Sequence, residues 1–299
     1  MNIYSQIKAN KTKTWLIIVL FILFVTTVIF IYGKASGYGL SYAGIGLIIS
    51  GIMGFSSYYY SDKMILGMSG AKQIAKKDNP QLFRTVENLC IGAGVPMPKI
   101  YVINDSAINA FATGRDPNHS VVCVTTGILD RLDKIELEGV IAHELSHVRN
   151  YDIRLMAIVV ILVGLVALLA DFFMRSLWYG GGRRERSDRS NAQGIFLLIG
   201  IVLAILSPVI ATIIQLAVSR KREFLADASG ALLTRYPEGL ASALEKISKD
   251  KEPLEAANNA TAHLYIANPF KVKNSKHWFA NLFNTHPPIE ERIKILRSM

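Results

Sequence analysis

Two histidines and a glutamate in one short segment have the spacing of a metal site with a base beside it. In His143-Glu144-Leu145-Ser146-His147, the two histidines are four residues apart and share one face of a helix, so both imidazoles can bind one metal ion. Glu144 is rotated around the helix and can address a water molecule on that metal. A surface cluster of His and Glu has the same short pattern, so this segment alone leaves both interpretations open.

A catalytic zinc ion usually takes three protein ligands and keeps one position open, so a third ligand must come from elsewhere. Glu223 and Asp227 are again four residues apart, directly after a long apolar segment. Glu223 can complete the ligand set, while Asp227 can accept the free ring N–H of a ligand histidine. By itself this segment reads as an ordinary charged helix at a membrane surface. However, an apolar hairpin separates the two motifs, and closing it brings them together. We therefore expect one Zn²⁺ per chain, held by His143, His147 and Glu223.

Composition indicates an integral membrane protein. The chain has 33 Lys+Arg against 23 Asp+Glu, a net charge of +10, and only 19% charged residues, where soluble chains carry about 25%. Abundant apolar residues exclude disorder. The basic residues are scattered and not interleaved with aromatics, which argues against nucleic-acid binding and favours contact with the lipid bilayer. Cys90 and Cys123 lie far apart, so a disulfide framework is not expected.

Four apolar segments predict two helical hairpins. The first hairpin, residues 1–62, has spans at about 15–32 and 37–61, and the lysines around it place both ends in the cytoplasm. Its length and the second span argue against a cleaved signal peptide. The second hairpin, residues 151–219, has spans at about 155–173 and 194–219. The loop between them is basic and the third segment is short, so whether this hairpin crosses fully is left open.

Residues 63–150 and 220–299 are predicted to form one cytoplasmic α+β domain, split by the second hairpin. We expect helices at 79–93, 133–150, 237–247 and 288–297, strands at 99–103 and 120–125, and a loop at 249–262. This domain would carry the zinc site on a membrane anchor.

These motifs, together with Asn109-Ala110-Phe111-Ala112-Thr113-Gly114 and Thr285-His286-Pro287-Pro288, resemble the M48 family of zinc metalloproteases. The resemblance covers essentially the whole chain and is greater to the bacterial HtpX-type heat-shock branch than to the CaaX prenyl protease branch. It implies a gluzincin-type fold, endopeptidase activity with Glu144 as general base, and a role in quality control of misfolded or damaged membrane proteins. The location that it implies is the bacterial plasma membrane.

Two further residues enter through this resemblance alone. The segment from Asn109 resembles the edge strand on which the family binds its substrate, although its residues by themselves would indicate a turn. His286 is a candidate donor to the substrate or to the oxyanion of the transition state. A surface histidine preceding a helix is an equally good interpretation of His286.

Other classes of function fit the sequence less well. An intramembrane zinc protease would need the His-Glu segment inside a spanning helix, but charged residues lie directly upstream of His143. A zinc-stabilised scaffold without activity has no use for Glu144, and a CaaX-type processing protease belongs to the branch with more apolar segments. The sequence therefore predicts a multi-pass, membrane-bound zinc endopeptidase acting on polypeptide substrates. It carries no signal for an oligomeric state.

Overall fold

The structure is a computed structural model of the chain, and it describes residues 3–35, 40–179, 220–257, 261–269 and 287–299. Its helices are α1 (Ile3–Ala35), α2 (Leu40–Met68), α3 (Pro80–Ala93), α4 (Thr126–Arg131), α5 (Lys134–Arg149), α6 (Asp152–Tyr179), α8 (Arg220–Thr234), α9 (Pro237–Lys249) and α11 (Ile289–Arg297), with 3₁₀ turns η1 (Pro117–His119) and η2 (Ala262–Leu264). Its strands are β1 (Lys72–Gln73), β2 (Lys99–Ile103), β3 (Ala110–Gly114) and β4 (Ser120–Thr125).

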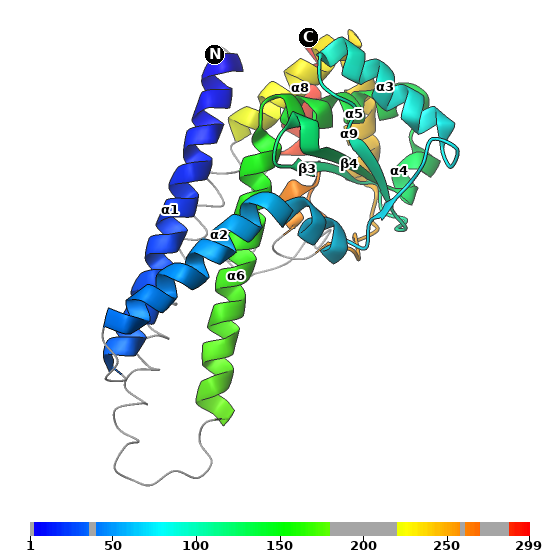
Figure 1. Cartoon of the computed structure of the whole chain (residues 1–299). Coiled ribbons are helices and arrows are strands. Elements are labelled where there is room, and N and C mark those ends of the chain that lie inside the picture. The colour runs from blue at the N-terminus through cyan, green and yellow to red at the C-terminus, as the bar shows by residue number, and fades with distance from the viewer. Residues whose placement is uncertain (1–2, 36–39, 180–219, 258–260, 270–286) are drawn as a thin grey trace.

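Three long helices, α1, α2 and α6, extend together away from the domain that contains the sheet (Figure 1). They pack through apolar side chains, with Phe21 and Val25 of α1 against Ile158 and Leu162 of α6. Among the described residues, one stretch is long and apolar enough to cross a membrane by length and composition, Ile7–Ile31 in α1. It contains most of the first predicted span. The fourth predicted span, 194–219, lies outside the described residues, so the two hairpins remain a prediction.

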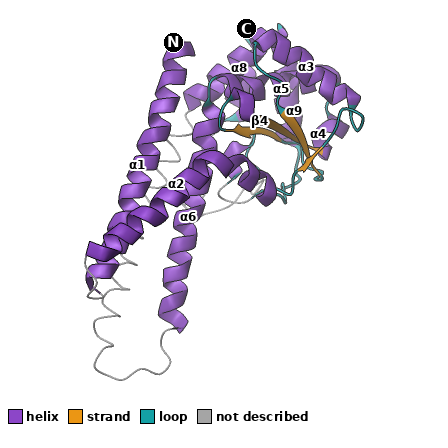
Figure 2. Cartoon of the chain, in the orientation of Figure 1, coloured by secondary structure: helices purple, strands orange, loops and turns teal. Residues whose placement is uncertain are grey.

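The four strands form one sheet in the order β1-β2-β4-β3, in which β2 and β4 are parallel and β3 is an antiparallel edge strand. Figure 2 shows the strands in orange among the helices of this domain. The strands predicted at 99–103 and 120–125 are present as β2 and β4. Side chains alternate along β3 and β4. Ala112 and Val122 face α5, whereas Phe111 and Cys123 pack against α2 and α6. The sheet therefore lies between α5 on one face and, on the other face, the C-terminal end of α2 and the N-terminal part of α6.

Helix α5 is the buried centre of the domain, and nearly all of its side chains from Glu136 to Val148 are buried. A capping box starts it, because Asp133 accepts the N–H of Glu136 and Glu136 accepts the N–H of Asp133. Helix α8 packs closely on α5, since a Cβ atom added at Gly230 of α8 would lie 3.1 Å from the backbone nitrogen of His143. This close approach sets the distance between the two motifs singled out in the sequence.

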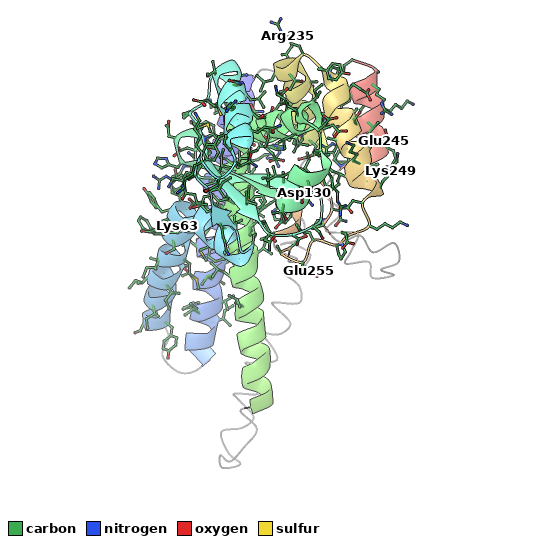
Figure 3. The ribbon with its side chains drawn as sticks, turned by 90° about the vertical axis from the view of Figure 1, so that its right-hand side faces the viewer. Lys63, Asp130, Arg235, Glu245, Lys249 and Glu255 are labelled. Carbon is green, nitrogen blue, oxygen red and sulfur yellow. The ribbon has the colours of Figure 1, made fainter. Side chains whose placement is uncertain are left out.

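Helices α9 and α11 complete the domain at positions close to those predicted. The inner face of α9 is buried and includes Leu240 and Leu244, whereas Glu245 and Lys249 lie on its outer face and point to solvent (Figure 3). The apolar face of the amphipathic helix α9 thus packs against α5.

Candidate metal centre

Helices α5 and α8 bring His143, His147 and Glu223 together at one buried point. One ligand atom from each lies within 4.8 Å of the others. The two Nε2 atoms are 3.2 Å apart, and they lie 3.7 Å (His143) and 3.5 Å (His147) from the carboxylate oxygens of Glu223. Two imidazole nitrogens and a carboxylate converging in a buried site form the donor set that zinc takes in proteins. The residues present therefore fit a zinc ion.

Each of the two histidines is held from behind by a buried carboxylate. Asp227, the predicted partner of a ligand histidine, has its Oδ1 at 2.9 Å from His143 Nδ1, and Asp152 has its Oδ2 at 3.1 Å from His147 Nδ1. A ring whose Nδ1–H is bound in this way presents Nε2 to a metal. Sequence reasoning did not single out Asp152. The signal available was its position five residues after His147, at the first turn of the next helix.

Arg292 on α11 is a second residue that sequence reasoning missed. Its side chain is fully buried, and its guanidinium binds Asp227 with two hydrogen bonds of 2.8 and 2.7 Å. It also donates to the Ile266 carbonyl at 2.9 Å and lies 3.8 Å from Glu223 Oε2. A charged residue at a periodic apolar position of the predicted helix 288–297 was the available signal. Arg292 compensates two buried carboxylates of the site.

Burial and neighbouring charges set the ionisation of the site. Burial raises the pKa of Glu144 to about 7, and Glu223 adds to this rise, while His147 and Arg292 act against it. A carboxyl group with a pKa near neutrality is suited to take up and pass on a proton. Burial opposes the charged form of His147, but Asp152 and Glu223 outweigh it and raise its pKa to about 9.

For His143 and its partner Asp227, the pKa values are lowered. Burial lowers the pKa of His143. The ring is therefore held in its neutral form, which is the form of imidazole that binds metals. Burial works against ionisation of Asp227, yet Arg292 and the hydrogen bonds around it hold the pKa of this carboxyl below its usual value. The ring of His143 thus faces an ionised acceptor.

Asn109 directly precedes β3, and its side chain is buried. Its amide nitrogen donates to the Ala267 carbonyl at 3.3 Å and its amide oxygen accepts the Ala110 N–H at 3.1 Å. These bonds hold the segment that follows η2 against β3, where Ile266 N–H also donates to the Ala110 carbonyl at 3.0 Å. Further along β3, the backbone of Ala112 lies close enough to Glu144 to act against the rise in the pKa of its carboxyl group. The other candidate, His286, lies outside the described residues.

Comparisons with known proteins agree with this geometry. A family model described as Peptidase family M48 matches residues 76–299. Two relatives named Protease HtpX homolog are similar over nearly their whole lengths. That of Dictyoglomus thermophilum is 49% identical over 99% of this chain and 94% of its own, and that of Caldanaerobacter subterraneus subsp. tengcongensis is 46% identical over 100% and 98%.

The crystal structure of S. mikatae Ste24p has a similar fold, with a TM-score of 0.51 and 20% identity over 92% of this chain. The chain spans 62% of the length of that protein. These matches confirm the resemblance drawn from the motifs. Taken with the two histidines and the glutamate that converge between α5 and α8, they show that the chain is a metalloprotease of peptidase family M48.

Proposed function

We propose that this chain is a membrane-bound endopeptidase that holds one zinc ion with His143, His147 and Glu223. The observation that carries this proposal is the convergence of their three ligand atoms within 4.8 Å, with each histidine held by a buried carboxylate. When bound, zinc supplies Lewis-acid chemistry, since it polarises a scissile carbonyl and makes a water molecule more acidic.

Glu144 is the proposed general base. It neighbours His143 on α5, is buried, and has a pKa of about 7. Its carboxylate takes a proton from the attacking water and passes a proton to the leaving amine. Asp227 and Asp152 keep the imidazoles oriented during this cycle, and Arg292 balances the charge of Asp227 and Glu223. His286 remains a candidate donor to the oxyanion.

The outer edge of β3 is the proposed site for the substrate backbone. In the antiparallel pair with β4, the main-chain groups of Ala110 and Ala112 point away from β4. The Ala110 carbonyl is bound by Ile266, whereas Ala112 lies beside Glu144. An extended peptide that adds as a further strand from Ala112 onward would pass the proposed base, and main-chain hydrogen bonds would bind it with little sequence preference.

The long helices support a location in a membrane. Large apolar side chains are exposed on α1 and α2, including Leu16, Leu23, Ile48, Ile52 and Phe55. An exposed apolar surface of this extent is typical of contact with acyl chains. We propose a multi-pass protein of the bacterial plasma membrane with hairpins at 1–62 and 151–219. Its protease domain, 63–150 and 220–299, faces the cytoplasm and cuts misfolded or damaged membrane proteins.

The test compares the full chain in detergent with Glu144→Gln at matched zinc content, using an unfolded polypeptide as substrate. We expect one zinc per chain in both and hydrolysis by the parent alone. Glu138→Gln is the matched control, because Glu138 lies on the same helix with its side chain 33% exposed. Equal cutting by parent and Glu144→Gln would refute the assigned base. Zinc binding without hydrolysis would favour a scaffold, and cutting of a prenylated CaaX peptide alone would favour a processing protease.

A further inference from the structure

A buried asparagine connects the N-terminal helix α1 to the candidate metal centre. Asn10 is only 3% exposed. Its Nδ2 donates to Asp152 Oδ1 at 2.7 Å and to the Asn150 carbonyl at 3.0 Å. The other oxygen of the same carboxylate, Asp152 Oδ2, lies 3.1 Å from His147 Nδ1. One carboxylate therefore joins α1 on one side to a proposed zinc ligand on the other.

The same asparagine also reaches the helix that carries the third proposed ligand. Its Oδ1 accepts a hydrogen bond of 3.2 Å from Arg222 Nη1, and this guanidinium nitrogen lies 3.6 Å from Asp152 Oδ1. Arg222 directly precedes Glu223 on α8. Figure 1 shows the end of α1 that carries the N-terminus on the same side of the molecule as α8. Asn10 thus ties α1 to the junction of α5 and α6 and to the start of α8.

The hydrogen bonds of Asn10 define one orientation of its amide. Both N–H donors face acceptors and the oxygen faces a donor, so a flipped amide would place like groups against each other. A buried amide is costly unless it is bonded, and a bonded network specifies one arrangement of the elements that carry it. Packing alone would be served by an apolar residue at this position of a helix that continues as an apolar run.

Thr14 provides the comparison within the same helix. It is fully buried one turn after Asn10, and its hydroxyl donates to the Asn10 carbonyl at 2.8 Å. This bond closes on α1 itself, whereas the bonds of Asn10 leave the helix. The two residues therefore share burial and differ in whether they reach the metal centre.

We propose that Asn10 is a positioning residue of the zinc site. Helix α1 then helps to orient a zinc ligand in addition to anchoring the chain in the membrane. Asn10 holds Asp152, and Asp152 holds the ring of His147 with its Nε2 directed at the metal. This inference rests on the proposed function, because it takes His147 as a zinc ligand. It follows that moving α1 away from the domain weakens zinc binding.

The experiment measures the zinc dissociation constant of the full chain in detergent by competition with a chromogenic chelator. Loss of a carboxylate behind a ligand histidine weakens metal binding by about 10- to 100-fold, which we expect for Asp152→Asn. For Asn10→Leu, which acts one bond further away, we expect a weakening of roughly 3- to 10-fold. Thr14→Val is the control and should retain the parent constant. The double variant of Asn10 and Asp152 should bind no more weakly than Asp152→Asn, because both act along one chain of contacts.

Peptide hydrolysis at saturating zinc gives a second readout, in which Asn10→Leu should lower kcat and leave KM unchanged. Parent-like zinc binding by Asn10→Leu, or strictly additive effects in the double variant, would overturn the inference while leaving the proposed function intact. A parent chain that binds no zinc would overturn the proposed function and this inference with it. If Asn10→Leu fails to fold by circular dichroism, Asn10→Ser repeats the test, because a single hydroxyl cannot serve all three partners.

Discussion

Replacing Arg292 by methionine removes a cation that contacts both Asp227 and Glu223, the buried carboxylates of α8. The guanidinium is fully buried, binds Asp227 at 2.7 and 2.8 Å, and lies 3.8 Å from Glu223. Methionine fills similar space without a charge. Removing one partner of a buried ion pair costs about 3–5 kcal/mol, because the other charge is left without compensation. We expect Arg292→Met to lower the free energy of unfolding by about this amount.

The same substitution should also weaken zinc binding. Asp227 loses the two hydrogen bonds that hold it beside His143, and loss of such support typically weakens metal affinity by about 10- to 100-fold. Because the folded variant binds zinc more weakly, zinc stabilises the variant less than the parent. The stability loss should therefore be larger in the zinc-loaded protein than in the zinc-free protein, by about 1.4 to 2.7 kcal/mol.

Arg297 supplies the control on the same helix. Its ion pairs with Glu238 and Glu245, at 2.9 and 2.8 Å, lie at the surface, and exposed pairs contribute little to stability. The assay is urea unfolding in detergent, followed by circular dichroism with and without zinc. We expect Arg297→Met to unfold close to the parent in both conditions. Equal losses for the two variants, or a zinc affinity unchanged by Arg292→Met, would refute the charge network derived for α8 and α11.

Two further predictions concern protonation and packing. In the metal-free protein the pKa of His147 is about 9, and a histidine must be neutral to bind zinc. Zinc binding below pH 9 therefore releases a proton, and the affinity rises with pH, about tenfold per unit. Calorimetry in buffers of different ionisation enthalpy measures this release, and its absence at pH 7 would contradict the assignment. Gly139→Ala should lower the melting temperature, because its Cβ would lie 2.6 Å from the Leu240 nitrogen of α9. Gly67→Ala, with open space around its Cβ, should leave the melting temperature unchanged.

Local features of the site could be predicted from the sequence. The helical period places His143 and His147 on one face whatever surrounds them, and Asp133 and Glu136 form the capping box that starts their helix. The same local rules located β2 and β4 at their observed bounds. A contact of Asp227 with one of the ligand histidines could also be anticipated, because the two motifs flank one apolar hairpin, but only the structure identifies that histidine as His143.

The tertiary structure alone decided the partners that act from a distance. By themselves, residues 109–114 indicate a turn, and Ala110–Gly114 form a strand because β4 offers main-chain partners on one side. Neither Arg292 nor Asn10 is a predicted site residue, since a sequence does not show which partner packing will bring to a charged or polar group. Burial turns such a group from a neutral surface feature into one that requires a partner. These contacts span 65 and 142 residues of the chain, and only the packing of α1, α8 and α11 around α5 brings the partners together.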